Sequence, residues 1–209
     1  MDLCSPINRM KGSGSILGRM SDSHNAFSIR RLFDAFRGSP SSGLARPDER
    51  TQPPPFRVRG AAELAAEPLR RVWDILEAKR QGRTFLRRSD IDPGELVFVL
   101  PLIGLIEVHQ PPLRFRHRLV GTGYRDALGF EATGLWTEEW PHLEQRALIV
   151  RCYVATVEAR EAIGFRTEFG GDKKHLRYEA LLMPLAADGE TIDMLFVAAA
   201  PILQTGTKP

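Results

Sequence analysis

Hydrophobic and polar positions in the second half of the chain predict one β-sheet and two main helices. Strand-like patterning occurs in residues 101–108, 114–120, 163–169, 175–185 and 191–202. From about Leu143 to Arg160 the apolar residues recur on one side of a helix. An earlier helix lies between Pro68, near its start, and Gly82, just past its end. Its apolar residues have i, i+3, i+4, i+7 spacing and are Leu69, Val72, Trp73 and Leu76.

The same patterning indicates how the strands are ordered. The segments RFRHRLV (114–120) and IGFRTEF (163–169) alternate between apolar and polar residues, which is typical of edge strands. The segments PLIGLIEV (101–108) and MLFVAAA (194–200) are apolar on both faces, which is typical of central strands. We therefore predict an α+β fold. It has a five-stranded antiparallel sheet in the order 2-1-5-4-3, with helices inserted between strands two and three and one helix ahead of the sheet.

The stretch RRSDIDPGEL, residues 87–96, contains two carboxylates and predicts the start of a short helix. Asp92 is suited to the N-cap, Pro93 to the first helical position, and Glu95 to the reciprocal position of a capping box. Asp90 lies just outside this helix, where it can accept hydrogen bonds from backbone amides. General acid–base catalysis needs two carboxylates that converge on one substrate. We interpret this pair as structural.

Residues 1–60 have a different character and are predicted to form a flexible basic arm. Residues 38–59 are rich in Gly, Ser and Pro and resemble a linker. Within residues 27–37 apolar side chains have helical spacing between arginines, so this short segment is a candidate for contact with a partner or a membrane surface. The alternative is a fragment with no stable structure of its own. We assign residues 61–203 to a folded domain and residues 204–209 to a tail.

Charge and cysteine content narrow the functional classes. The arm holds ten Lys/Arg against five Asp/Glu, whereas residues 61–209 hold 19 against 21. The folded part therefore lacks the basic excess of a nucleic-acid-binding face. No segment has the roughly 18 consecutive apolar residues of a membrane span, and the first 30 residues lack the apolar stretch of a signal peptide. The two cysteines, Cys4 and Cys152, are far apart and indicate neither a disulfide framework nor a zinc site. We expect a cytoplasmic protein.

Three motifs in order resemble a known family. They are RSDIDP, then RFRHRLVGTGYRDALGFEATG, then YEALLMPLAADGETIDMLF. Together they are similar to a bacterial PAS-like family found mostly in alphaproteobacteria, and the resemblance covers about residues 61–203. It implies a sensory or adaptor domain that binds a small ligand, a protein or both.

Candidate site residues follow from the predicted sheet. Alternation places His117 on the core side of its strand, either as a hydrogen-bonded core residue or as a polar contact in a ligand cavity. Trp136 and Trp140 are expected to cover the sheet or flank the mouth of that cavity. The pocket candidates are Phe115, His117, Leu119, Trp136, Phe165, Tyr178, Met194 and Phe196. The candidates for a structural ion pair are Arg118, Glu179 and Asp193.

Signatures of catalysis and cofactor binding are absent from the sequence. It contains no complete dinucleotide fingerprint, P-loop, GxSxG or HExxH, and its histidines lack metal-ligand spacing. Cys152 lies among apolar residues of a helix and is read as an inert thiol. We therefore assign no catalytic or metal-binding residue, and the sequence identifies no cofactor.

These observations favour a stand-alone sensory or adaptor protein that signals through a protein partner. The helix with the Leu69, Val72, Trp73 and Leu76 stripe is a candidate for homodimer contact, although the stripe can also pack on its own sheet. Two alternatives remain open. One is a small α+β pocket enzyme of the hydratase or isomerase type, for which His117 and Asp193 are the only candidate pair. The other is a structural adaptor that binds no small molecule.

Overall fold

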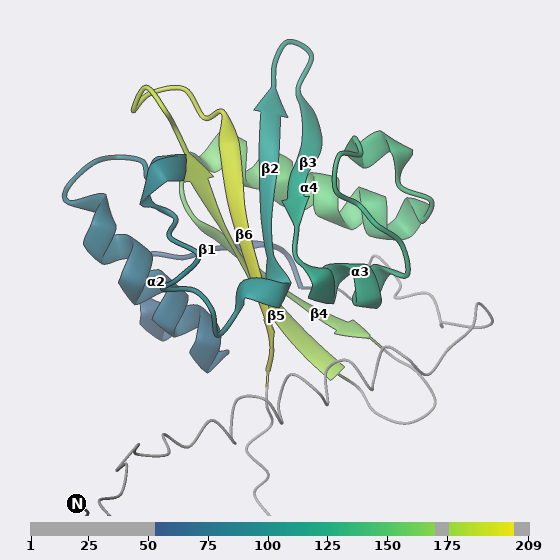
Figure 1. Cartoon of the computed structure of the whole chain (residues 1–209), viewed down its shortest axis with the longest axis horizontal. Helices are drawn as coiled ribbons and strands as arrows, with labels where there is room; N and C mark the ends of the chain where they lie inside the picture. The colour runs from purple at the N-terminus through teal and green to yellow at the C-terminus, as the bar shows by residue number, and fades with distance from the viewer. Residues whose placement is uncertain (1–52, 170–175, 203–209) are drawn as a thin grey trace, which may run out of the picture.

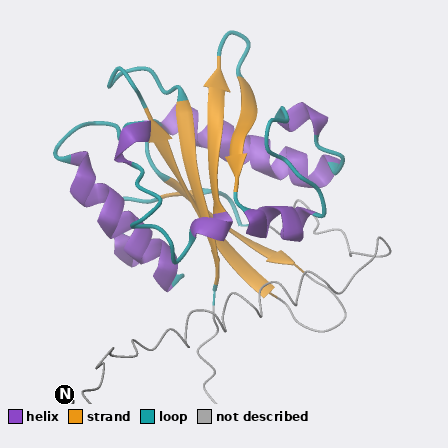
Figure 2. Ribbon diagram, viewed as in Figure 1, coloured by secondary structure: helices purple, strands orange, loops and turns teal. Residues whose placement is uncertain are grey.

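The computed structural model describes residues 53–169 and 176–202, which form a six-stranded antiparallel sheet with helices on both faces (Figures 1 and 2). The sheet order is β1-β4-β5-β6-β2-β3. The strands are β1 (Phe56–Arg57), β2 (Ile103–His109), β3 (Arg114–Val120), β4 (Ile163–Phe169), β5 (Leu176–Leu185) and β6 (Met194–Pro201).

The sheet has one strand more than the sequence predicts. The other five lie in the expected order, with β2 beside β6 through pairs such as Leu105 with Phe196. The extra strand, β1, belongs to the segment that we interpreted as linker, and it pairs with β4. The ring of Phe56 lies on Gly164, where a Cβ would stand 2.7 Å from the Phe56 Cε2 atom. Consequently β4 is not an edge strand, and β1 is too short for its alternation to be recognised.

The helices divide between the two faces of the sheet. In Figure 1, α4 (Leu143–Ala159) crosses behind the strands, whereas η3 (Leu100–Leu102) lies in front of them with α2 (Glu67–Arg80). The remaining helices are η1 (Ala61–Glu63), η2 (Arg88–Asp90), α3 (Thr122–Leu128) and η4 (Thr137–Glu139). Within the described residues, no helix has the length and apolar character needed to cross a bilayer.

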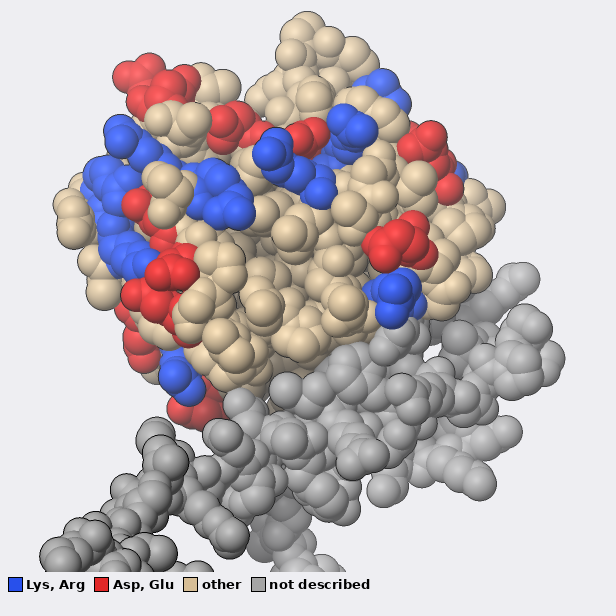
Figure 3. Space-filling model, viewed as in Figure 1, with Lys and Arg blue, Asp and Glu red and all other residues tan. Residues whose placement is uncertain are grey.

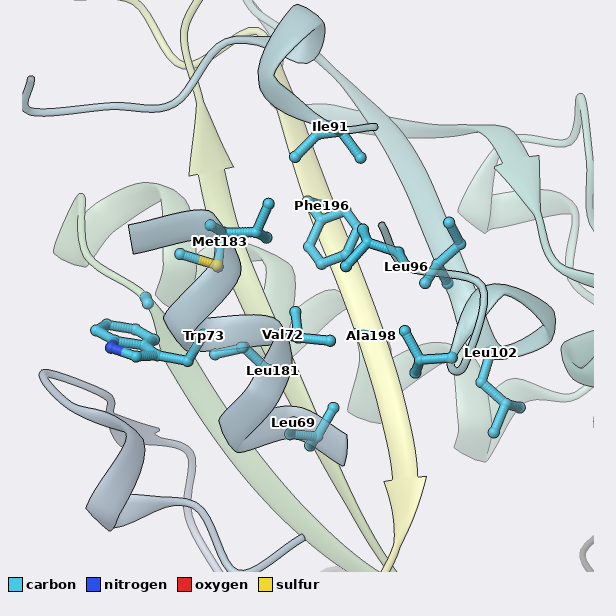
Figure 4. Packing of buried hydrophobic residues seen from close by; sticks show 14 of the residues in the cluster. Leu69, Val72, Trp73, Ile91, Leu96, Leu102, Leu181, Met183, Phe196 and Ala198 are labelled. Atoms are coloured by element: carbon cyan, nitrogen blue, oxygen red, sulfur yellow. The ribbon is translucent and has the colours of Figure 1, made fainter. Parts of the chain in front are cut away.

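The apolar stripe of α2 packs on the sheet of its own chain. Leu69, Val72 and Leu76 have no exposed surface, and Trp73 is almost fully covered. They contact Leu181 and other residues of β5 and β6 (Figure 4). The stripe is therefore not available for the homodimer contact that we considered, because exposing it would remove one side of the core.

The helix that we predicted to begin at Asp92 does not form. Residues 93–99 instead make a series of turns that lead into η3. The Asp92 carboxylate accepts a hydrogen bond from the Gly94 amide at 2.8 Å, which closes a local turn. Glu95 does not complete a capping box, since its side chain pairs with Lys79. A glycine directly after the proline weakens the helix here, and the turns bury Leu96 and Val99 against the α2 face.

Asp90 has the role of the capping residue in this region. Its carboxylate accepts a hydrogen bond from the Arg87 amide at 2.7 Å and lies 2.9 Å from the Arg83 guanidinium. The expected helix at residues 27–37 and the tail at 204–209 lie outside the described residues.

Candidate functional site

A β-bulge in β3 determines which side chains reach the α4 face of the sheet. His117 pairs with Ile106, but Leu119 pairs with Leu105, so that Arg118 is an extra residue in β3. The bulge reverses the side-chain alternation after His117. Leu119 therefore points to the opposite face and is 40% exposed, which removes it from the predicted pocket. Phe115 and His117 remain buried on the α4 side.

His117 is 1% exposed and has hydrogen-bond partners at both ring nitrogens. Its Nδ1 lies 3.3 Å from the carbonyl oxygen of Leu135, and its Nε2 lies 3.2 Å from the hydroxyl of Tyr153. A carbonyl oxygen can only accept, so the proton of the neutral ring resides on Nδ1. The Tyr153 hydroxyl then donates to Nε2. The loop that contains Leu135 also bonds to the main chain of His117, since the Gly134 amide donates to the His117 carbonyl at 2.6 Å.

Trp140 completes this group of side chains. Its ring centroid lies 4.6 Å from that of His117, and Phe130 meets it edge-on at 5.3 Å. Trp140 is buried, yet its Nε1–H has no hydrogen-bond partner within the described part of the chain. A buried donor without an acceptor costs free energy, so it marks a position where a polar group of another molecule would be stabilised. We refer to His117, Tyr153, Tyr124 and Trp140 as the His117 cluster.

The ionisable groups at this cluster are all held in their neutral forms. Burial lowers the pKa of His117 from its ordinary value of 6.5 to about 4. Burial raises the pKa of Tyr153 well above its usual range, and the neighbouring Tyr124 and Cys152 add to this effect. Burial likewise raises the pKa of Tyr124, and it raises that of the Cys152 thiol to about 12. Cys152 is therefore buried and protonated, in line with our interpretation of an inert thiol.

The other pocket candidates do not come together around His117. Phe165 packs at the margin of the α4-face core. The remaining candidates lie in the core on the α2 face of the sheet, so the sheet separates them from His117. They are Tyr178, Met194 and Phe196. Trp136 lies near the end of the β2–β3 hairpin, with the Arg114 guanidinium 4.0 Å above its ring and His109 at 4.9 Å. The sequence therefore predicted one pocket, but the structure divides these residues among the α4-face core, the α2-face core and the end of the β2–β3 hairpin.

The predicted ion pair is also assembled differently. Glu179 is fully buried, and its Oε1 accepts a hydrogen bond from Arg166 Nε at 2.8 Å. Its Oε2 accepts from the backbone amides of Ala65 at 2.7 Å and Ala66 at 2.8 Å, directly before α2. Arg118 is not the partner of Glu179, because it lies on the surface and contacts Glu107 at 3.1 Å. Asp193 is exposed and precedes β6.

Neither metal binding nor the considered catalytic pair has a counterpart in the described residues. Residues 53–169 and 176–202 contain no group of three or more His, Cys, Asp or Glu side chains that could hold a metal ion. The two ring nitrogens of His117 contact Leu135 and Tyr153, so His117 does not form a pair with Asp193.

Comparison with known families identifies the domain. Residues 64–198 match the profile of the PAS domain, and this match covers more than half of the chain. The chain belongs to the PAS domain family. Searches among curated proteins and among solved structures returned no match. PAS domains generally act as sensory and signalling modules, so membership assigns this PAS protein to that broad class.

Two members of the His117 cluster were missed as site residues by the sequence reasoning. Tyr153 lies beside Cys152 in α4, outside the apolar stripe, and Tyr124 follows the strand end in VGTGYRD. The signal in the sequence was that each residue is a tyrosine, an aromatic side chain with a polar hydroxyl, among apolar or small neighbours. It does not indicate that Tyr153 reaches His117 or that Tyr124 lies near Tyr153, because both depend on how α3 and α4 pack on the sheet.

Proposed function

We propose that this PAS protein is a sensory module whose input element is the His117 cluster and whose ligand is a small uncharged molecule. The observation that carries the proposal is the Trp140 indole N–H, which is buried beside His117 without a hydrogen-bond partner in the described residues. A ligand with a carbonyl or ring-nitrogen acceptor would satisfy this donor. The neighbouring aromatic rings would contact its flat apolar part.

The neutral state of the cluster explains why the proposed ligand carries no charge. Burial keeps the imidazole, both phenols and the thiol uncharged near neutral pH. A charged ligand placed among them would lose its hydration without gaining an opposite charge. The same state argues against catalysis at this position, because acid–base catalysis is most effective when the pKa lies near the working pH.

We further propose that the output of the module is contact with a protein partner. The described residues form one domain-sized sheet with its covering helices, and the family supports a signalling function. Binding at His117 would act on the loop before α4, because the imidazole Nδ1–H and the His117 main chain both bond to residues 134–135.

Native mass spectrometry of the full chain purified from its own host tests the ligand. We expect a population with added small-molecule mass that disappears on denaturation. Trp140→Phe keeps an aromatic ring but removes the free N–H, so it should reduce the bound fraction at least tenfold. Trp136→Phe is the matched control at the hairpin end and should leave the bound fraction unchanged. Absence of bound mass from host-purified protein would instead support a ligand-free adaptor. Equal loss in both variants would show that the Trp140 N–H is not the specific contact of the ligand.

A further inference from the structure

One part of the α2 face of the sheet is not covered by α2, and we propose that it docks an acidic amphipathic helix of a partner protein. Five residues form this surface, which we call the Arg–Leu surface: Val97, Leu100, Arg116, Arg118 and Leu119. It lies across the sheet from the His117 cluster, and its argument does not depend on any ligand there. Figure 3 shows this face, where a broad area without charged side chains adjoins a group of basic and acidic ones.

The apolar half of the Arg–Leu surface consists of three aliphatic side chains. Val97 is 64% exposed, Leu119 40% and Leu100 37%. The main chain of Leu100 lies against the end of β3, two residues beyond Leu119, because a Cβ on Gly121 would stand 2.7 Å from the Leu100 carbonyl oxygen. Val97 and Leu100 are three residues apart, and Phe98 and Val99 between them pack in the α2-face core. Exposed aliphatic residues that gather in this way are typical of contact sites.

The basic half of the Arg–Leu surface consists of Arg116 and Arg118, which the bulge in β3 places beside Leu119. Arg116 pairs across the strands with Glu107, which faces the same side as Leu105, and Arg118 is the extra residue of the bulge. Both arginines turn to one carboxylate, with Arg118 3.1 Å and Arg116 4.0 Å from Glu107. One negative charge facing two positive charges leaves the group basic. Exposed ion pairs of this kind contribute little stability, so Arg118 can exchange its partner on binding. Arg116 also donates to the Gly134 carbonyl at 3.2 Å, which holds it at the edge of the surface.

Charge and hydrogen bonding argue against three other occupants of this surface: a second copy, the basic arm and an added β-strand. A second copy docking by two-fold symmetry would bring together two surfaces with the same excess of positive charge. The arm of the same chain is basic and carries the same sign of charge. An added β-strand would need the outer edge of β3, but the His117 amide and carbonyl already bond to Leu135 and Gly134. A helix with apolar residues along one side and Asp or Glu beside them matches both halves of the surface.

Site-specific crosslinking in the protein's own host tests this proposal. The full chain would carry a photo-crosslinking residue at position 119, or at position 151 on the exposed side of α4 as the control. We expect position 119, and not position 151, to crosslink a protein segment rich in Asp and Glu with helical apolar spacing. A synthetic peptide of that segment would then be titrated by fluorescence anisotropy.

The titration compares matched charge reversals on the two faces. Arg118→Glu should weaken binding about tenfold, and Arg151→Glu less than about twofold, because only the first residue lies on the Arg–Leu surface. Added salt should weaken binding to the unsubstituted chain. Crosslinks to lipid or to a second copy, no crosslink above the control, a segment without acidic residues, or equal effects of the two reversals would each overturn the proposal. Both arginines are exposed, and thermal melting would verify that the variants fold.

Discussion

The two faces of the sheet are packed with different kinds of side chain. Against α2, the core is mainly aliphatic with a few aromatic rings, and its buried carboxylate, Glu179, accepts hydrogen bonds at both oxygens. Against α4, the core contains His117, Tyr153 and Trp140, with one N–H that no described residue accepts. The buried carboxylate of the α2 face has hydrogen-bond donors at both oxygens, whereas the Trp140 N–H of the α4 face has no acceptor among the described residues.

This contrast separates a polar group whose hydrogen bonds are saturated from a group with an unused donor. Glu179 connects β5 to the two residues before α2, and its partner Arg166 also donates to the Glu63 carbonyl at 2.9 Å. Such a saturated carboxylate holds the N-terminal segment in place. The His117 cluster has neutral groups and an N–H without an acceptor among the described residues. Under the proposed function, binding there would change the packing of α4 and of the loop before it. Four changes test the contrast.

The largest effect is expected from opening the α2-face core. Leu76→Ala removes a fully buried side chain and should lower the free energy of unfolding by about 2–5 kcal/mol. Leu143→Ala, at a leucine that is 64% exposed, is the matched control and should change it by less than about 0.5 kcal/mol. Urea denaturation measures both. Similar small effects would show that α2 does not pack on its own sheet.

Acid should destabilise the protein through the α4 face. Burial lowers the pKa of His117 from 6.5 to about 4, so between these values the unfolded chain binds a proton that the folded chain does not. The free energy of unfolding should therefore fall as the pH is lowered from 6.5 to 4, by on the order of 3 kcal/mol from this group. Denaturation at several pH values would measure the slope.

Two histidine variants isolate this contribution. His117→Gln should flatten the slope between pH 6.5 and 4, whatever its effect on stability at pH 7. His109→Gln, at an exposed histidine near the hairpin end, should keep the slope of the unsubstituted protein. If both variants retained the slope, the pH dependence would have to come from other groups.

The sequence predicts the layout of the sheet better than the site because the two depend on different information. Apolar runs such as MLFVAAA identify β6 as central, since full burial on both faces leaves a direct pattern. The bulge at Arg118 has no such pattern, and it moves Leu119 to the opposite face. Asp92 met the local rules for a helix cap, but burial of Leu96 and Val99 through turns prevailed. The partners of His117 and Glu179 come from distant segments, which local periodicity cannot bring together.

A smaller effect is expected at the carboxylate of the α2 face. Glu179→Gln keeps the shape but turns one accepting oxygen into a donor that faces other donors, which should cost about 1–3 kcal/mol. The amides of Ala65 and Ala66 should exchange hydrogen faster, because the one oxygen that remains is neutral and a weaker acceptor than a carboxylate. Glu67→Gln is the control, since that exposed residue pairs only with Arg70 in the described contacts, at 2.8 Å. Unchanged exchange in Glu179→Gln would mean that the carboxylate does not hold this segment.

The smallest change concerns one hydrogen bond of the α4 face. Tyr153→Phe removes the hydroxyl 3.2 Å from His117 Nε2 and should lower the free energy of unfolding by about 1 kcal/mol. Nitrogen NMR of the imidazole rings gives a more specific readout, with His109 as the internal control. In the unsubstituted protein we expect a proton on Nδ1 and a hydrogen-bonded Nε2, and in the variant an Nε2 without a donor. A proton on Nε2 in the unsubstituted protein would contradict the assignment, because Nδ1 would then face the Leu135 carbonyl without a hydrogen to share.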